Sequence, residues 1–124
     1  MSAPLSNATA EEVVRACRTQ IGDELRSITY FTPEDAQHLY LREDLERGDK
    51  LGFVETERVG FDLQRTYNWS ELGEYNFTLR DFENGYLVRI IADTNGVYLT
   101  TDSLTMSQFE EVTSAVKRIL DELD

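Results

Sequence analysis

The chain has 124 residues, a mass of 14.3 kDa and 24 acidic against 12 basic residues, so its formal net charge at pH 7 is -12. This length leaves room for one domain, and six Phe, six Tyr and many β-branched residues argue against disorder. No segment reaches the roughly 18 consecutive apolar residues of a membrane span, and no export signal is visible, so we expect a cytoplasmic protein.

The basic residues are ten arginines and only two lysines, Lys50 and Lys117. An acid excess with few lysines is the surface expected in a salt-rich, halophilic cytoplasm, where salt screens the self-repulsion. Because carboxylates are so frequent, adjacent acidic pairs are best interpreted as solvated faces and do not indicate acid–base catalysis.

We predict a flexible N-terminus over residues 1–8 and a single α+β domain over residues 9–123. The domain begins with a helix, because Thr9 and Glu12 have capping-box spacing just before a one-sided apolar series. That series consists of Val13, Val14, Cys17, Ile21 and Leu25. Cys17, the only cysteine, is predicted to be a small buried hydrophobic residue and not a reactive thiol.

Two short β-branched and aromatic runs, residues 28–32 and 37–42, flank a turn and predict a hairpin. The segment from 44 to 66 fits a helix, although alternation at Val59, Phe61 and Leu63 also permits a strand pair.

Alternating residues over 75–80 predict a half-buried strand, with Tyr75, Phe77 and Leu79 on its apolar side. The dipeptides Asn84-Gly85 and Asn95-Gly96 tolerate positive φ and predict hairpin turns to two further strands. A final amphipathic helix starts at Thr105 or Ser107. The predicted fold class is therefore α+β, an antiparallel sheet of about five strands with amphipathic N- and C-terminal helices on one face and a middle helix on the other.

This element order resembles the profilin-like architecture of roadblock/light-chain-seven and longin domains. Residues 9–120 are also similar to small acidic proteins of halophilic archaea that have no assigned function. That similarity is strongest after Leu72, in the segments LGEYNFTLR (72–80), GYLVR (85–89), GVYLTTD (96–102) and FEEV (109–112). The first resemblance implies a small GTPase or a larger assembly as partner, and the second brings no catalytic residues to carry over.

No pattern in the chain predicts a catalytic, cofactor-binding or metal site. The single histidine, His38, has no second metal ligand nearby and is interpreted as a structural or surface residue. Asp93 starts a calcium-like loop that lacks further oxygen ligands, and the scattered glycines form no phosphate-binding loop. Nucleic acid is disfavoured as a partner, because the arginines are dispersed among a twofold excess of acid.

The candidate interface consists of Arg65, Tyr67 and Trp69 in a predicted loop before the third strand, since aromatics and arginine together suit an interaction hot spot. The same large aromatics also suit the core of a small domain, and that interpretation is favoured for Tyr67 and Trp69.

The leading functional prediction is a non-enzymatic interaction or scaffold module with a protein partner, homodimeric through a sheet edge or helix face. One alternative is a small-molecule sensor or enzyme, with a cleft between the sheet and the middle helix lined by His38, Tyr40 or Arg89. A second alternative, a ribosome- or nucleic-acid-associated factor, requires an arginine-rich face.

Overall fold

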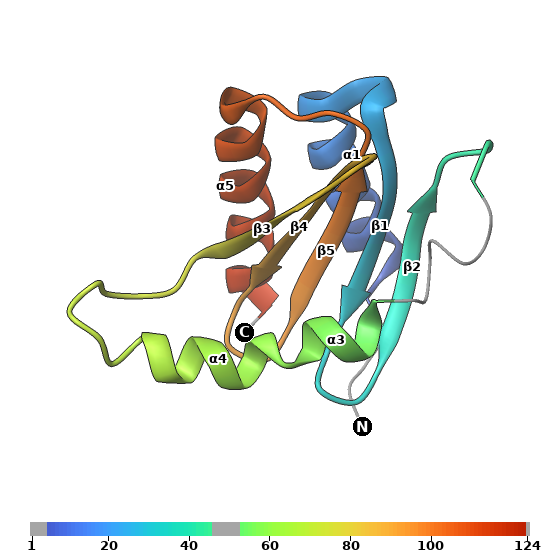
Figure 1. Ribbon diagram of the computed structural model, residues 1–124. Coiled ribbons are helices and arrows are strands. Elements are labelled where there is room, and N and C mark those ends of the chain that lie inside the picture. The colour runs from blue at the N-terminus through green and yellow to red at the C-terminus, as the bar shows by residue number, and fades with distance from the viewer. Residues whose placement is uncertain (1–4, 46–52, 124) are drawn as a thin grey trace.

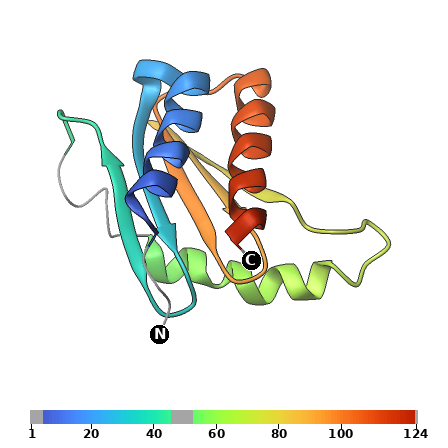
Figure 2. The ribbon, with the colours of Figure 1, turned by 180° about the vertical axis from the view of Figure 1, so that it is seen from behind.

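A computed structural model describes residues 5–45 and 53–123, and it contains an antiparallel five-stranded sheet between two layers of helices (Figure 1). The strands are β1 (Leu25–Phe31), β2 (Ala36–Leu41), β3 (Phe77–Phe82), β4 (Gly85–Ile91) and β5 (Gly96–Thr101). The helices are α1 (Asn7–Ile21), α3 (Val54–Arg58), α4 (Gly60–Tyr67) and α5 (Met106–Leu123), with a 3-10 turn η1 (Gly22–Glu24) after α1. Helices α1 and α5 lie side by side on one face, and α3 and α4 cover the other (Figure 2). The predicted fold class is confirmed.

The strand order is β2-β1-β5-β4-β3, with every neighbouring pair antiparallel. The last strand in the sequence, β5, therefore returns to pair with the first, β1, so that Ile28 lies opposite Leu99. Strands β2 and β3 form the two edges of the sheet.

Period-two alternation in the inner strands sends side chains into two separate cores. Ile28, Ile90 and Leu99 pack under α1 and α5, whereas Leu87 and Tyr98 pack under α3 and α4. The larger core is completed by one face of each terminal helix, which supplies Val13, Cys17, Ile21, Val112, Val116 and Leu120. Cys17 is fully buried, which confirms its predicted place in the core, and this burial raises the pKa of its thiol to about 12.

Helix α1 begins directly after Ser6, whose hydroxyl accepts the N–H of Thr9 at 3.1 Å. The predicted cap at Thr9 is therefore wrong, because a serine three residues earlier takes this role. Leu5 is buried against the larger core. The first half of the predicted flexible segment, residues 1–4, lies outside the described residues.

The predicted helix over residues 44–66 is only partly correct. Residues 43–45 form a turn and a bend, residues 46–52 lie outside the described residues, and helix begins at Val54. A break at Val59 separates α3 from α4. The alternative strand pair is wrong for residues 54–67, which are helical apart from the break at Val59. Of the alternating apolar residues Val59, Phe61 and Leu63, only Phe61 is buried.

Both predicted Asn-Gly hairpins are present, but their glycines lie in strands and not in the turns. Phe82 pairs with Gly85, and Gly96 is the first residue of β5. Among the described residues no non-glycine has a positive φ, so the turn geometry that this dipeptide favours is absent from these segments. A Cβ on Gly85 would meet the carbonyl oxygen of Thr101, and one on Gly96 would lie 2.8 Å from Phe31 Cζ. These glycines thus permit close packing.

The start of the last helix agrees with the sequence prediction. Gln108 N–H donates to Thr105 Oγ1 at 3.1 Å, and Thr105 N–H donates to Gln108 Oε1 at 2.9 Å. This reciprocal capping box begins α5 and confirms Thr105 as its cap.

Candidate functional site

A buried charge cluster joins helix α3 to the sheet beneath it. Glu57 of α3 and Arg89 of β4 are each 1% exposed, and Arg89 Nη1 donates to Glu57 Oε1 at 2.9 Å. Arg80 of β3 approaches the same carboxylate, with Nε 2.9 Å from Oε2. Two guanidinium groups therefore share one buried carboxylate.

Arg89 is held by further bonds at the floor of a cavity. Its Nη2 donates to the hydroxyls of Tyr75 and Thr78, both at 2.8 Å, and Thr78 lies directly opposite it on β3. Its Nε is buried without a hydrogen-bond partner, and an ideal Cβ on Gly60 would lie 2.8 Å from that atom. Glycine at this position therefore lets α4 approach the arginine closely.

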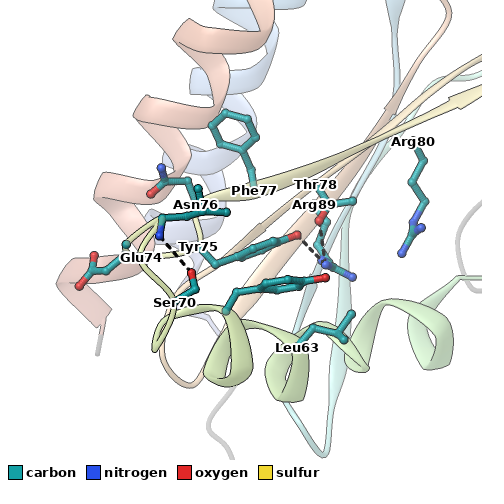
Figure 3. Close-up of a pocket in the computed structure, with 12 residues that line it drawn as sticks. Leu63, Ser70, Glu74, Tyr75, Asn76, Phe77, Thr78, Arg80 and Arg89 are labelled. Atoms are coloured by element: carbon teal, nitrogen blue, oxygen red, sulfur yellow. Dashed lines mark hydrogen bonds between the residues drawn. The ribbon is translucent and has the colours of Figure 1, made fainter.

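The cavity lies between α4, the loop after it, and β3, and has a volume of about 520 Å³ (Figure 3). Leu63, Tyr67 and Leu72 provide its largely apolar walls, and Arg80 and Arg89 its cationic end. The remaining lining residues are Ser70, Gly73, Glu74, Tyr75, Asn76, Phe77 and Thr78. This volume is in the range of small-molecule pockets.

The outer strand β3 exposes large apolar side chains on both sides of the sheet. Phe77, Leu79 and Phe82 are 36%, 42% and 48% exposed. Phe77 packs edge-on against Phe109 of α5, whereas Phe82 contacts Phe53 at the other face. The predicted alternation is correct for Phe77 and Leu79, which lie in this partly covered edge strand. It is wrong for Tyr75, which precedes the strand and bonds through its hydroxyl to Arg89 on the α4 side.

The opposite edge strand, β2, is better covered. Its residues from Gln37 to Leu41 are half-buried, the guanidinium of Arg18 stacks over the Tyr40 ring, and Leu5 N–H donates to Gln37 Oε1. The open edge of this sheet is therefore β3.

The predicted interface residues lie close together at the end of α4, but only one of them lines the cavity. Tyr67 is 49% exposed and stacks on Tyr75, with ring centroids 5.9 Å apart. Trp69 is 91% exposed, and Arg65 pairs with Asp62 at the surface. The interpretation of Tyr67 and Trp69 as core residues is wrong, because Tyr67 ends α4 with its side chain half exposed and Trp69 lies in the exposed loop that follows.

Sequence reasoning missed Leu72 and the acid–arginine cluster. Leu72 is 91% exposed, yet in the sequence it resembles any hydrophobic residue of a small domain. Of the three residues expected in a cleft, only Arg89 lines this cavity. Tyr40 lies on β2, as does His38, whose Nδ1 is 3.2 Å from Thr29 Oγ1.

Most arginines of the described segments are paired with acid, and Arg15 and Arg118 line a groove together with Glu12 and Glu122. The ion-paired arginines are Arg26, Arg42, Arg58, Arg65, Arg80 and Arg89. Within residues 5–45 and 53–123 there is also no group of three or more His, Cys, Asp or Glu placed to hold a metal ion. No helix of this part of the chain is long and apolar enough to cross a membrane.

Three solved structures share this architecture over nearly their whole length. An MglB with a tetrameric arrangement superposes with a TM-score of 0.68 at 13% identity, covering 98% of this chain and 96% of the other. The gliding protein MglB of Thermus thermophilus gives 0.61 at 13% identity, with 98% and 97% coverage. MglB of Myxococcus xanthus gives 0.63 at 8% identity, again with 98% and 97% coverage. At these identities the likeness establishes the fold, which is the roadblock-type arrangement predicted from the element order.

No curated protein sequence matches the chain significantly. A family model described as a domain of unknown function (DUF7522) matches residues 11–121. The chain therefore belongs to this family.

Proposed function

We propose that this protein is a non-enzymatic interaction module that forms a homodimer by pairing two β3 edges. One observation carries the proposal: β3 is an open edge strand whose large side chains, Phe77, Leu79 and Phe82, are all more than one-third exposed. Such an edge presents unpaired N–H and C=O groups that another strand can satisfy.

A second copy fits this edge better than an arbitrary strand does, because the side-chain sequence of β3 is compatible with two-fold symmetry. An antiparallel pair centred on Leu79 places two leucines together and sets Thr78 opposite Arg80 of the partner copy. Centring on Arg80 or Asp81 would instead place like charges opposite one another. The symmetric register is therefore centred on Leu79 or on Thr78.

The loop after α4 extends the apolar edge and supplies a surface for a different protein. Trp69 and Leu72 are each 91% exposed, and exposed aromatic residues are typical anchors of protein interfaces. The resemblance to roadblock domains favours a small GTPase or a larger assembly as this partner. We place the module in a halophilic cytoplasm, where salt screens the repulsion between two chains that each carry a charge of -12.

The homodimer is tested by the variant Leu79→Lys, measured by size-exclusion chromatography with light scattering in molar KCl. The wild type is expected to elute at twice the chain mass and Leu79→Lys at the chain mass, because lysine on an edge strand opposes pairing. The matched control is Met106→Lys, which adds the same charge at a 66% exposed position of α5 and is expected to stay dimeric. A wild type that remains monomeric at about 0.1 mM, or an unchanged Leu79→Lys dimer, contradicts the β3 pairing.

A further inference from the structure

We infer that the cavity between α4 and β3 binds a small carboxylate with a flat apolar body, its carboxylate facing Arg80. The inference does not depend on the dimer, because the cavity lies on the α4 side of the sheet and is lined by residues of a single chain.

The charge balance at the cationic end of the cavity favours an anion. Glu57 is the shared partner of both Arg80 and Arg89, so one carboxylate offsets two guanidinium groups. The other lining carboxylate, Glu74, is exposed and points away from Arg89 in Figure 3. A positive excess in a partly desolvated recess is unusual for a chain of net charge -12 and attracts negative ligands.

Hydrogen-bond donors remain available at that end. Arg80 uses Nε and Nη2 for Glu57, and its Nη1 makes no hydrogen bond to a described residue. The side chain of Arg80 is 39% exposed, so a ligand can reach it. Nor does the Tyr67 hydroxyl, which also lines the cavity, bond to any described residue. A carboxylate can thus accept charge-assisted bonds from Arg80 without breaking the Glu57 pair.

The walls define the other half of the ligand. Leu63 and Leu72 are apolar, and the Tyr67 and Tyr75 rings lie nearly parallel, 17° apart. A volume of about 520 Å³ accommodates a fused ring system with a short chain. Aromatic faces next to a fixed cation are suited to an aryl or branched carboxylic acid.

The probes are 2-naphthylacetate and its neutral isostere 2-naphthylacetamide, titrated into the full chain and followed by ¹H–¹⁵N NMR shifts and calorimetry. We expect the acid to bind with a Kd of roughly 0.1–1 mM, to shift the amides of β3 and α4, and to bind about tenfold more tightly than the amide. Equal binding of both probes, or no shift at 10 mM acid, overturns the inference.

Two variants locate the binding at Arg80. Arg80→Gln retains the buried Glu57–Arg89 pair and is expected to lower affinity for the acid at least about tenfold while leaving the amide unaffected. Arg65→Gln removes an equal charge from the exposed face of α4 and is expected to change neither. If Arg80→Gln proves unfolded by circular dichroism, Leu63→Glu replaces it, because a carboxylate on the wall repels the acid selectively. If the folded variant binds the acid as tightly as the wild type does, the carboxylate site at Arg80 is refuted. A wild type that is monomeric but still binds the acid refutes only the proposed β3 dimer.

Discussion

Arg89 and Glu57, 32 positions apart in the sequence, form an ion pair in which both side chains are 1% exposed. This pair connects the inner strand β4 to helix α3 across the smaller of the two cores. Because neither charge has access to bulk water, each depends on the other for its solvation.

We expect Glu57→Gln to lower the free energy of unfolding by about 3 kcal/mol, since it leaves Arg89 buried with no counter-charge. Replacing both residues, as Glu57→Met with Arg89→Met, is expected to recover most of that loss. The measurement is urea denaturation followed by circular dichroism. Glu55→Gln, which changes an 85% exposed side chain of the same helix, is the control and should alter stability by less than about 0.5 kcal/mol. Equal losses of unfolding free energy in Glu55→Gln and Glu57→Gln would show that the buried ion pair contributes no more to stability than the exposed one.

Gly60 is predicted to resist substitution because of what lies beneath it. An ideal Cβ there would lie 2.6 Å from Arg89 Cζ and would also meet Ile91 Cδ1, and both of those side chains are buried. Although alanine favours helix, we expect Gly60→Ala to destabilise the fold by about 1–3 kcal/mol through overpacking. Thr66→Ala, at an exposed position of α4, serves as the comparison in thermal denaturation and is expected to be nearly neutral or stabilising. A higher melting temperature for Gly60→Ala would mean that α4 can move away from the sheet at little cost.

Asp102 gives the fold an acid-sensitive contact between the strands β1 and β5 and the turn after β2. Hydrogen bonds from Arg42 and Arg26, at 2.6 and 2.9 Å, hold the pKa of this carboxyl below its usual value, Arg42 having the larger effect. A pKa that is lower in the folded state gives stability that is present above about pH 4 and is lost as the pH falls through the folded-state value. Because the side chain is 35% exposed, the contribution is about 1 kcal/mol or less.

We therefore expect Asp102→Asn to be less stable than the wild type at pH 7 and nearly equal to it at pH 2.5. The free energy of unfolding in urea at both pH values measures this difference. Glu11→Gln, on the exposed side of α1, is the control. A stability gap for Asp102→Asn that stays constant from pH 7 to pH 2.5 would contradict the linkage.

Salt is expected to stabilise the whole molecule, because the net charge of -12 repels itself when unscreened. Lowering KCl from 2 M to about 0.1 M lengthens the Debye length to about 10 Å and should lower the melting temperature by several degrees. Scanning calorimetry in both buffers provides the measurement. The control is the same calorimetry in 2 M and 0.1 M sucrose, which is excluded from the protein surface but does not screen charge. Equal melting temperatures in the two KCl buffers would contradict the proposal of a halophilic habitat.

The sequence was sufficient to predict the sheet and its terminal helices, because alternation at Phe77 and Leu79 and one-sided series such as that of α1 are local patterns. It could not place the turns, since the roles of Gly85 and Gly96 depend on the carbonyl of Thr101 and the ring of Phe31, which lie on other strands. The exposure of Trp69 and Leu72 could not be predicted for a similar reason. Hydrophobicity alone does not distinguish a core residue from an apolar residue in an exposed loop.

The candidate site was least accessible to sequence analysis. Glu57 is one of 24 acidic residues and nothing in its neighbourhood distinguishes it, although it is the carboxylate that both Arg80 and Arg89 approach. Arg89 offered a weak signal, as a charged residue inside the apolar run of β4. A charge at an inward position of an inner strand predicts a buried partner, but the identity of that partner follows only from the tertiary packing of α3.

The pairing of β5 with β1 also has a kinetic consequence. Register partners such as Ile28 and Leu99 are some 70 residues apart in the sequence. Strand β1 of the first hairpin therefore cannot pair with β5 until almost the entire chain has been synthesised. Closing a loop of this length costs entropy before the sheet contacts repay it, and folds dominated by distant pairings fold slowly. The hairpin of β1 and β2 must therefore wait with an unsatisfied edge during translation, and joining β5 to β1 is expected to be the late step that commits the molecule to its native state.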